Sequence, residues 1–538
     1  MQPVLLAVFS GLSYVFSFAP WDQGYLQWIA FIPLFFAVDS LKNPSKKQIF
    51  GLGFILSLSI CLGGFYWIVH ATQQYGGLPL FAALALFAVF CVVGQLQVPL
   101  YLLLRNALRK TAPFQSRPWL WFLVSGLLYA GIESLYPKLF LDTAGNAFYR
   151  SLYFRQAADI GGPFFLTALV IAFAELVTAA WIGRKKPYAI AAAILLVLTT
   201  GYGYARVSQI HALEAQANTG EKLRVAMVQA NIGDFVKVAA ENGTVGAANQ
   251  VMGQYLGLTT QAVRAEKTPD LVVWPETAYP AIFDKPMSPT EARMDREMKD
   301  FAEGYQTIAP KGTFAFGGYD EDSTPLDYNS LFFYRIENGQ PIKQVYHKSV
   351  LLMFGETLPF ADTFPSMKSW FPTMGFFGRG PGPQVYEIQN AQGSAFKLAP
   401  SICYEGLFSD HSITGARMGA DALLNVTNDS WFGEHGEPYL HLALTVFRSI
   451  ETRLPMLRST NTGFSVAIDP TGEITKSTRL LHPDVLVTEI PHRLPLTSPD
   501  LAISAYLGAN WFVRLCQGLL IALLFGMVCL KRFQVSKP

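Results

Sequence analysis

The chain has 538 residues, of which 51% are hydrophobic, 14% aromatic and only 15% charged. This composition is too apolar for an ordinary soluble enzyme, and it predicts that part of the chain lies in lipid. A formal net charge of +2, with no dense basic cluster interleaved with aromatic residues, argues against a nucleic-acid partner.

Eight apolar stretches are interpreted as membrane-spanning helices, because most approach the ~20 residues that a helix needs to cross ~30 Å of hydrocarbon. They are residues 4–18, 25–38, 49–69, 78–104, 119–135, 161–182, 188–204 and 512–530. The first two are short, so the prediction is about eight spans. The first stretch is interpreted as a retained helix and not as a cleaved signal peptide, because Met1-Gln2-Pro3 carries no basic side chain and further spans follow.

The long interval between the seventh and eighth stretches contains no such run. Short alternating strands with turn signals take its place and alternate with helices, which predicts an α/β domain. The chain is therefore expected to comprise a transmembrane bundle over residues 1–204, an inserted catalytic domain over 205–509, and a last span with its tail over 510–538.

The basic residues in the connections predict the orientation, because Lys and Arg near span ends are retained in the cytoplasm. They follow the second, fourth, sixth and last stretches. The connection after the fifth stretch, with Lys138, Arg150 and Arg155, dilutes this pattern without reversing it. We therefore expect a cytoplasmic amino terminus and an inserted domain on the outer side, which in a bacterial cell is the periplasm.

Two acidic residues, Glu133 and Glu175, lie inside apolar stretches, where a charge costs about 2.5 to 3.5 kcal/mol. We interpret both as neutral or hydrogen-bonded carboxyls within the bundle, because the stretches contain no evident Lys, Arg or His partner. The scarcity of such charges also argues against a transporter.

One cysteine stands apart from the other four. Cys403 lies in the polar part of the chain, at the end of an apolar run that predicts a strand over residues 396–402. A strand-to-turn corner of this kind exposes a nucleophile and directs backbone N–H groups toward a developing oxyanion. An unpaired thiol is unusual in an oxidising compartment, so its presence indicates a chemical role. The remaining cysteines lie inside apolar stretches: Cys61, Cys91, Cys516 and Cys529.

Two charged residues follow other predicted strands. Glu276 comes after the buried strand 271–274 and Pro275, which places it at the carboxyl edge of a sheet. Lys348 follows the second arm of a hairpin, at residues 342–347. Each alone has an ordinary interpretation, as a helix-start acid and as a solvated lysine.

Together with a cysteine, these two residue types can form an acyl-transfer site. The carboxylate can take the thiol proton, and the ammonium can favour the thiolate and stabilise a tetrahedral oxyanion. The alternative is a structural cysteine with unrelated surface charges, and composition alone does not exclude it.

Four motifs in order resemble those of the nitrilase superfamily. They are Trp274-Pro275-Glu276-Thr277, the segment from Tyr346-His347-Lys348 to Phe354-Gly355-Glu356, Ile402-Cys403-Tyr404-Glu405, and Asn428-Asp429-Ser430-Trp431-Phe432-Gly433. With seven apolar stretches before them, one after, and Leu457-Arg458-Ser459-Thr460-Asn461 near the end, the whole chain resembles the apolipoprotein N-acyltransferase family. The resemblance implies a nitrilase-like αββα sandwich inserted in a multi-pass α-helical membrane bundle.

The same resemblance implies a Glu-Lys-Cys triad, with Glu276 as general base and acid, Lys348 as transition-state stabiliser and Cys403 as nucleophile. The cysteine would carry the acyl chain as a thioester, and no cofactor or metal is implied. The acyl donor would be a membrane phospholipid, and the acceptor the α-amine of the diacylglyceryl-cysteine of an apolipoprotein. The location would be the bacterial inner membrane. The matched supporting or substrate-binding residues are Glu356, Tyr404, Glu405, Trp431 and Glu451.

Two further features concern lipid. The chain departs from the family at Gly233 and at Val236-Lys237-Val238, where a proline and a tryptophan are common, which affects lipid contacts more than the chemistry. Residues 371–382 are rich in phenylalanine and glycine. The hypothesis is that Phe376 and Phe377 dip toward the membrane and gate lipid entry. The alternative is a loop folded onto its own domain.

Two other functions remain open at this point. A membrane-tethered amidase would release its acyl group to water, and the triad alone does not distinguish it from a transferase. The apolar spans and the apolar loop favour lipid-derived acyl groups. A transporter or scaffold with an outer binding domain would not need Cys403 for its activity.

Overall fold

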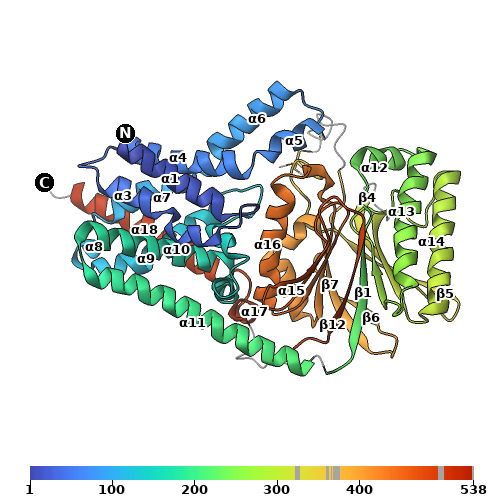
Figure 1. The fold of residues 1–538 in the computed structure, drawn as a ribbon. Coiled ribbons are helices and arrows are strands. Elements are labelled where there is room, and N and C mark those ends of the chain that lie inside the picture. Colours follow the sequence, from blue (N-terminus) through green and yellow to red (C-terminus); the bar gives the residue numbers. More distant parts are fainter. Residues whose placement is uncertain are drawn as a thin grey trace. The chain divides into compact units, whose positions relative to one another are not determined.

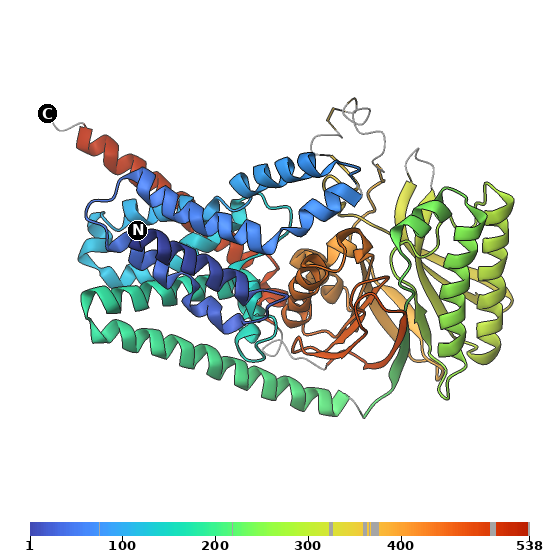
Figure 2. The ribbon, with the colours of Figure 1, turned by 45° about the horizontal axis from the view of Figure 1, so that its top comes forward.

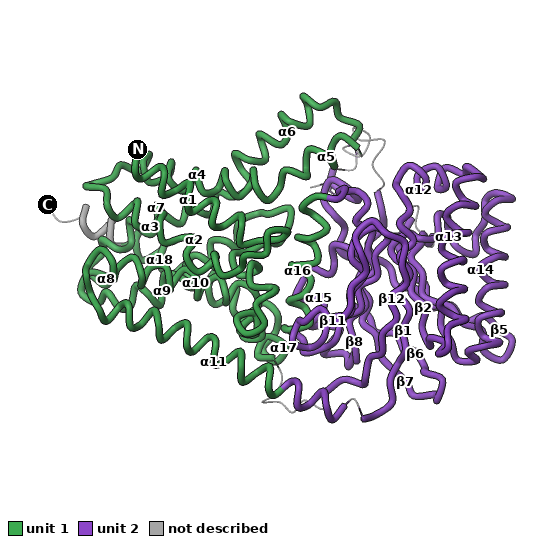
Figure 3. Tube along the Cα trace, viewed as in Figure 1, with its two compact units in different colours: residues 1–209, 435–451, 502–538 green, residues 210–434, 452–501 purple. Residues whose placement is uncertain are grey.

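The computed structural model describes residues 1–74, 76–217, 219–321, 327–358, 363, 364, 366, 376–494 and 502–535, with side chains up to residue 529. The chain divides into two compact units, which Figure 3 shows in different colours. Unit 1 comprises residues 1–209, 435–451 and 502–538, and unit 2 comprises residues 210–434 and 452–501.

Unit 1 is helical. Its longer helices are α1 (Gln2–Ser17), α3 (Ile32–Asp39), α4 (Lys46–Gly64), α6 (Leu80–Val93), α7 (Gln97–Leu108), α9 (Pro118–Leu135), α10 (Ala158–Gly183), α11 (Lys186–Ala217, up to residue 209), α16 (Glu437–Thr452, up to residue 451) and α18 (Trp511–Val535). Short elements join them: η1 (Gly24–Leu26), α2 (Gln27–Ala30), α5 (Trp67–Gln74), α8 (Ala112–Ser116), η2 (Ala144–Phe148), η3 (Phe154–Ala157) and α17 (Ile503–Leu507).

Most of these helices are suited to lipid. Within the described residues, six helical segments are long and apolar enough to cross a membrane: Lys46–Gly64, Leu80–Leu108, Pro118–Leu135, Phe154–Gly183, Lys186–Ala217 and Trp511–Cys529. Gln2–Ser17 and Gly24–Asp39 are shorter apolar helices. These segments overlap the eight predicted stretches in order, so the expected multi-pass helical class is confirmed.

The acidic residues inside this bundle have cationic partners. The Arg105 guanidinium lies 2.6 Å from both Asp39 and Glu175, and the Lys138 ammonium lies 3.3 Å from Glu133. The interpretation of Glu133 and Glu175 as carboxyls without such partners was therefore wrong. The apolar run ends at residue 104, but α7 continues to Leu108 and buries the Arg105 side chain.

Unit 2 contains two six-stranded sheets (Figure 1). The first has the order β12-β1-β2-β3-β4-β5, and the second has the order β11-β10-β9-β8-β7-β6. Their bounds are β1 (Lys222–Gln229), β2 (Leu271–Val273), β3 (Thr313–Glu321), β4 (Asp327–Glu337), β5 (Gln340–His347) and β12 (Asp484–Pro491), then β6 (Tyr386–Gln389), β7 (Ala395–Ile402), β8 (Ala422–Thr427), β9 (Met456–Thr460), β10 (Val466–Ile468) and β11 (Ile474–Ser477).

The central strands of each sheet are parallel and the outer ones antiparallel. β1, β2 and β3 form one parallel set, and β7, β8 and β9 form the other. Every residue of β2 and β8 is buried, which fits the continuous apolar runs expected of strands covered on both faces.

Side chains from both sheets meet in one core. Val225 and Met227 of β1 belong to the same buried cluster as Leu424 and Val426 of β8. On the outer face of the first sheet lie α13 (Val245–Val263) and α14 (Pro289–Ile308), side by side in Figures 1 and 2. α15 (Ser409–Arg417) contacts β7 and β8. The expected αββα sandwich is therefore confirmed.

In this topology the candidate site residues follow the ends of strands. β2, β7 and β8 end just before Glu276, Cys403 and Asn428, and β5 ends at the residue before Lys348. In the second sheet, Ile402 of β7 is paired with Val426 of β8, so the residues that follow these two strands leave from the same edge. The carboxyl ends of parallel strands are the usual site of chemistry in α/β folds.

Candidate active site

Cys403 occupies a sharp corner between a strand and a helix. β7 ends at Ile402, and the short helix η5 (Cys403–Leu407) begins at the cysteine itself. Its φ is +52°, a left-handed conformation that is uncommon for a residue other than glycine and that is often found at functional sites. The side chain is partly buried and packs against the core between the sheets. The corner therefore has the form predicted for a nucleophile.

Glu276 and Lys348 form a buried ion pair. The exposed fractions of the two residues are 6% and 1%, and Lys348 Nζ donates to Glu276 Oε1 at 3.1 Å. The second carboxylate oxygen of Glu276 accepts from the backbone N–H of Asn428 at 2.9 Å. The loop after β8 thus holds the carboxylate that follows β2.

A second carboxylate shares the same ammonium. Glu356 Oε1 accepts from Lys348 Nζ at 2.7 Å, and its other oxygen accepts from the backbone N–H of Leu352 at 2.8 Å. Asn329, in β4, donates through Nδ2 to both Glu276 and Glu356, at 2.8 and 3.1 Å. Lys348 is therefore fixed between two carboxylates, and Glu356 is brought to the site as the resemblance implied.

The charges of this cluster determine its protonation. Burial opposes the charged form of Lys348, but Glu276 and Glu356 outweigh it and raise the pKa of Lys348 well above its ordinary value. Burial likewise opposes the Glu276 carboxylate, yet Lys348 and Lys237 hold the pKa of Glu276 below its ordinary value. The two residues are therefore an ammonium and a carboxylate at neutral pH.

The protonation of the Cys403 thiol differs from the thiolate that the Lys348 ammonium was expected to favour. Desolvation and then the Glu276 carboxylate raise the pKa of Cys403 well above its ordinary value. Lys348 lowers it, as expected from the sequence, but does not outweigh those effects. The resting nucleophile is consequently a neutral thiol beside a carboxylate, an arrangement suited to general-base activation and not to a standing thiolate.

Glu405 connects the cysteine corner to the lysine loop. Its Oε1 accepts from the backbone N–H of Ser349 at 2.6 Å and from that of Val350 at 3.0 Å. Its Oε2 accepts from the Tyr346 hydroxyl at 2.7 Å and from the backbone N–H of Ile402 at 2.8 Å. Glu405 is fully buried and so fixes the loop after β5 against the end of β7. Its role is positional.

Several residues that hold the site were not predicted from the sequence. Asn329 is one, and its signal is a polar residue at a buried position of a strand that also contains four aromatic residues. Lys237, noted only as a departure, is buried, contacts Thr277 Oγ1 and acts electrostatically on Glu276. Arg458 donates to Asn425 at 2.7 Å and to Asp429 at 3.0 Å, which supports the two loops around Cys403 and Asn428.

The other predicted supporting residues differ in their placement. Tyr404 is buried with its ring edge-on to Phe408, and Trp431 is 44% exposed. Glu451 belongs to unit 1, where it pairs with Arg448 at 3.0 Å. The triad lies in unit 2, so the role of Glu451 at the triad stays a prediction.

Phe376 and Phe377 are partly buried, and the Phe377 ring stacks on Tyr319 with centroids 5.8 Å apart. The preceding part of their predicted loop, residues 371–375, lies outside the described residues.

Comparison with known proteins gives the family. The model of the apolipoprotein N-acyltransferase N-terminal domain matches residues 10–176, and the carbon-nitrogen hydrolase model matches residues 224–494. An apolipoprotein N-acyltransferase of Bdellovibrio bacteriovorus is 31% identical over 89% of this chain and 85% of its own length. That of Geobacter metallireducens is 31% identical over 90% and 89%.

A solved structure is also similar in part. A Saccharomyces cerevisiae member of branch 10 of the nitrilase superfamily covers 53% of this chain and 93% of its own, at 16% identity and a TM-score of 0.36. At this identity and TM-score, the similarity supports no conclusion about this chain. The two family models and the two bacterial relatives are sufficient: the chain belongs to the apolipoprotein N-acyltransferase family, and its candidate active site lies in the carbon-nitrogen hydrolase domain.

Proposed function

We propose that this protein transfers an acyl chain from a membrane phospholipid, through a thioester on Cys403, to the α-amine of the diacylglyceryl-cysteine of an apolipoprotein. The observation that carries the proposal is the buried Glu276–Lys348 ion pair in the domain that presents Cys403 at a strand-end corner. Membership of the N-acyltransferase family supports acyl transfer over simple hydrolysis. The products would be a triacylated lipoprotein and a lysophospholipid.

The first half-reaction follows from the protonation of the site. Glu276 takes the thiol proton while Cys403 Sγ attacks the ester carbonyl of the phospholipid. Lys348 stabilises the resulting oxyanion, together with backbone N–H groups in the first turn of η5, where a helix leaves such donors without intrahelical acceptors. The carbon–oxygen bond then breaks, and Glu276 returns the proton to the departing lysophospholipid oxygen.

The second half-reaction repeats these steps with a different nucleophile. The α-amine of the apolipoprotein attacks the thioester carbonyl, and Glu276 takes a proton from the amine. Lys348 again stabilises the oxyanion. The carbon–sulfur bond breaks, Cys403 Sγ recovers the proton, and an amide remains on the acceptor.

We also propose that the catalytic domain faces the periplasm from the bacterial inner membrane and that the amino terminus is cytoplasmic. The alternating basic connections support this orientation. The basic residues after α9 run against the pattern, but they have partners: Lys138 lies 3.3 Å from Glu133, and Arg150 lies 2.7 Å from Asp22. Because these ion pairs give Lys138 and Arg150 a structural role, the position of the two residues is weak evidence against the proposed orientation. Labelling of single cysteines introduced at Lys42 and Gly77 from each side of intact cells tests the assignment.

The decisive experiment is covalent. The purified full-length protein is incubated with phospholipid, and peptides are searched by mass spectrometry for an acyl adduct on Cys403. We expect an adduct that is absent from Cys403→Ala, while Cys529, a second partly buried cysteine, stays unmodified. Activity without an adduct would falsify the thioester mechanism.

Transferase and hydrolase are separated by the acceptor. A diacylglyceryl-modified peptide added to the acyl-enzyme should acquire a blocked amino terminus and discharge Cys403 faster than buffer does. Equal discharge with and without the peptide would favour the membrane-tethered amidase.

The proposed lipid gate has its own test. The double variant Phe376→Ser/Phe377→Ser should slow acylation of Cys403 by phospholipid without unfolding unit 2. The control is Met287→Ser, which removes an apolar side chain that is 79% exposed. The stacking of Phe377 on Tyr319 fits the alternative of a loop folded onto its own domain, and an unchanged acylation rate would establish that alternative.

A further inference from the structure

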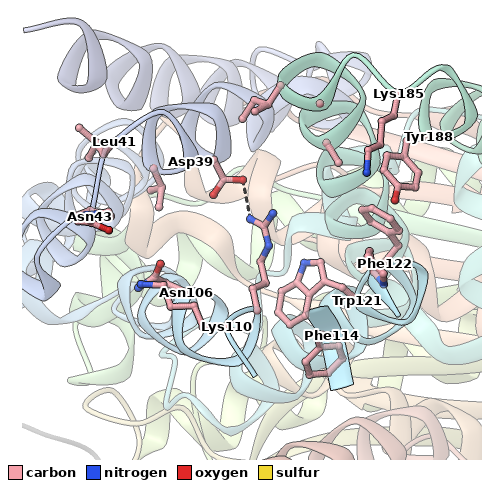
Figure 4. Close-up of a pocket in the computed structure, with 17 residues that line it drawn as sticks. Asp39, Leu41, Asn43, Asn106, Lys110, Phe114, Trp121, Phe122, Lys185 and Tyr188 are labelled. Carbon is pink, nitrogen blue, oxygen red and sulfur yellow. Dashed lines mark hydrogen bonds and ion pairs between the residues drawn. The ribbon is translucent and has the colours of Figure 1, made fainter. Parts of the chain in front are cut away.

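Unit 1 contains a cavity of about 530 Å³ that is unrelated to the triad (Figure 4). It is formed by the ends of α3, α7 and α10, by α8, and by the starts of α9 and α11. All the triad residues belong to unit 2, so the cavity is not part of the candidate active site.

The cavity is lined by more positive than negative charge. Arg109, Lys110 and Lys185 are its cationic residues, and Asp39 is its one carboxylate. Asp39 is already bound by Arg109 at 2.6 Å and by Arg105, which lies behind it, at 2.6 Å. Among the described residues, Lys110 and Lys185 have no carboxylate partner, and both are exposed. Two ammonium groups therefore remain for an anionic ligand.

An unused donor lies in the wall of the same cavity. Trp121 is only 3% exposed, and its indole Nε1–H has no hydrogen-bond acceptor within the described part of the chain. Figure 4 shows Trp121 beside Phe122 and Phe114, which make the rest of this wall apolar. A buried donor without an acceptor destabilises the fold, so an acceptor supplied by a ligand would be favourable.

We propose that this cavity binds the phosphate headgroup of an anionic phospholipid. The lysines and the indole N–H match the charge and the acceptor oxygens of a phosphate diester, and the aromatic wall suits the adjoining glycerol and acyl carbons. The cavity lies where apolar helices end, which is the depth at which a bilayer presents its headgroups. The lipid joins the ends of α3, α7 and α10 to the start of α11, and it stabilises unit 1 without entering the acyl-transfer reaction.

The experiment measures lipid binding by native mass spectrometry on the full-length protein in neutral detergent. Phosphatidylglycerol is compared with phosphatidylcholine. The variant Lys110→Gln/Lys185→Gln should bind phosphatidylglycerol about 25-fold more weakly, since each basic residue near an anionic surface contributes about five-fold. The matched control, Lys46→Gln/Lys47→Gln, removes the same charge from exposed residues of α4 that do not line the cavity. It should bind like the unmodified protein.

A second pair of variants tests the indole. Trp121→Phe should weaken phosphatidylglycerol binding by about ten-fold, because a hydrogen bond to a charged acceptor is lost. The control is Trp28→Phe, since Trp28 is also buried with an unpartnered Nε1 among the described residues but does not line the cavity. It should leave the affinity unchanged.

Three results would overturn the proposal. They are equal losses in the lysine variant and its control, equal affinity for phosphatidylcholine, and competition by soluble glycerol 3-phosphate at the affinity of the lipid, which would identify a site for free phosphate esters. Acyl transfer by the lysine variant, measured in phosphatidylcholine micelles with a supplied donor, should be unaltered. Failure of this proposal is therefore distinguishable from failure of the proposed function.

Discussion

Replacing Glu276 by Gln separates the role of this carboxylate as general base from its electrostatic effect on the pKa of Cys403. The side chain keeps its volume, and one oxygen can still accept from Lys348 and Asn329. It loses the ability to take a proton. General-base catalysis contributes about 10²- to 10⁴-fold, so acylation of Cys403 should slow by that factor, which corresponds to about 3 to 5 kcal/mol in the barrier. Formation of the acyl adduct measures this rate.

In the same variant the thiolate fraction of Cys403 should increase, although its acylation slows. The Glu276 carboxylate raises the pKa of Cys403, and Lys348 lowers it. Without the carboxylate charge the pKa of Cys403 falls, and a larger fraction is thiolate at a given pH. The pH dependence of Cys403 alkylation by iodoacetamide, followed by peptide mass spectrometry, reports this shift. Cys403→Ala gives the background from the other cysteines, and Glu387→Gln, at an exposed position of β6, is the control for loss of a carboxylate.

An unchanged or higher apparent pKa for the alkylation of Cys403 in Glu276→Gln would refute this prediction. That result would mean that the carboxylate and the thiol are not electrostatically coupled. An unchanged rate of acylation would be equally damaging, because it would remove Glu276 as the base. A fall in both the alkylation pKa and the acylation rate is the only combination that the geometry allows.

Four more predictions follow from the same contacts. The kcat/KM for the phospholipid donor, which reports acylation of Cys403, should be flat from about pH 5 to about 8.5, because the pKa of Glu276 is shifted down and those of Lys348 and Cys403 are shifted up, away from this window; a rising limb near pH 7 would contradict it. Lys348→Met should abolish acylation and lower the free energy of unfolding by about 3 to 5 kcal/mol in a denaturant titration, because the buried Glu276 and the partly buried Glu356 lose their ammonium, whereas Cys403→Ala should leave stability nearly unchanged. Gly317→Ala should reduce the acylation rate, because the added Cβ would lie 2.3 Å from the Pro275 carbonyl and 2.7 Å from Glu276 Cα; Gly304→Ala, in open space on α14, is the control and should keep full activity. Glu175→Gln should lower the Tm of the protein without changing acylation of Cys403, because Arg105 then keeps only Asp39 as a charged partner; a change in the acylation rate at unchanged Tm would refute this structural role.

The positions of the catalytic candidates could be predicted because each follows a strand that the sequence signals. Cys403 and Glu276 follow apolar runs, and Lys348 follows the second arm of a hairpin. Within each sheet, the parallel order of the central strands brings their carboxyl ends to one edge. What periodicity cannot supply is the pairing between strands. Asn329 reaches Glu276 because β4 lies beside β3 in the first sheet, and that register is set by the tertiary fold.

The membrane bundle shows where hydropathy misleads. Arg105 ends an apolar run and therefore resembles a residue of a basic connection. The helix continues past it, however, and turns it toward two acidic residues from distant stretches, Asp39 and Glu175. The charge is tolerated because it is neutralised by partners more than 60 residues away in the sequence. A hydropathy profile contains no information about such partners.

Under the proposed periplasmic orientation, the protonation of the site also bears on how a lone cysteine persists in an oxidising compartment. The thiolate, and not the thiol, is the form that oxidants and disulfides attack. A standing thiolate paired with Lys348 would be exposed to that chemistry between turnovers. Desolvation and the Glu276 carboxylate instead raise the pKa of Cys403, which disfavours a standing thiolate between turnovers. If so, Glu276→Gln should lose Cys403 to oxidation faster than the unmodified protein in aerobic buffer, which a time course of titratable thiol would show.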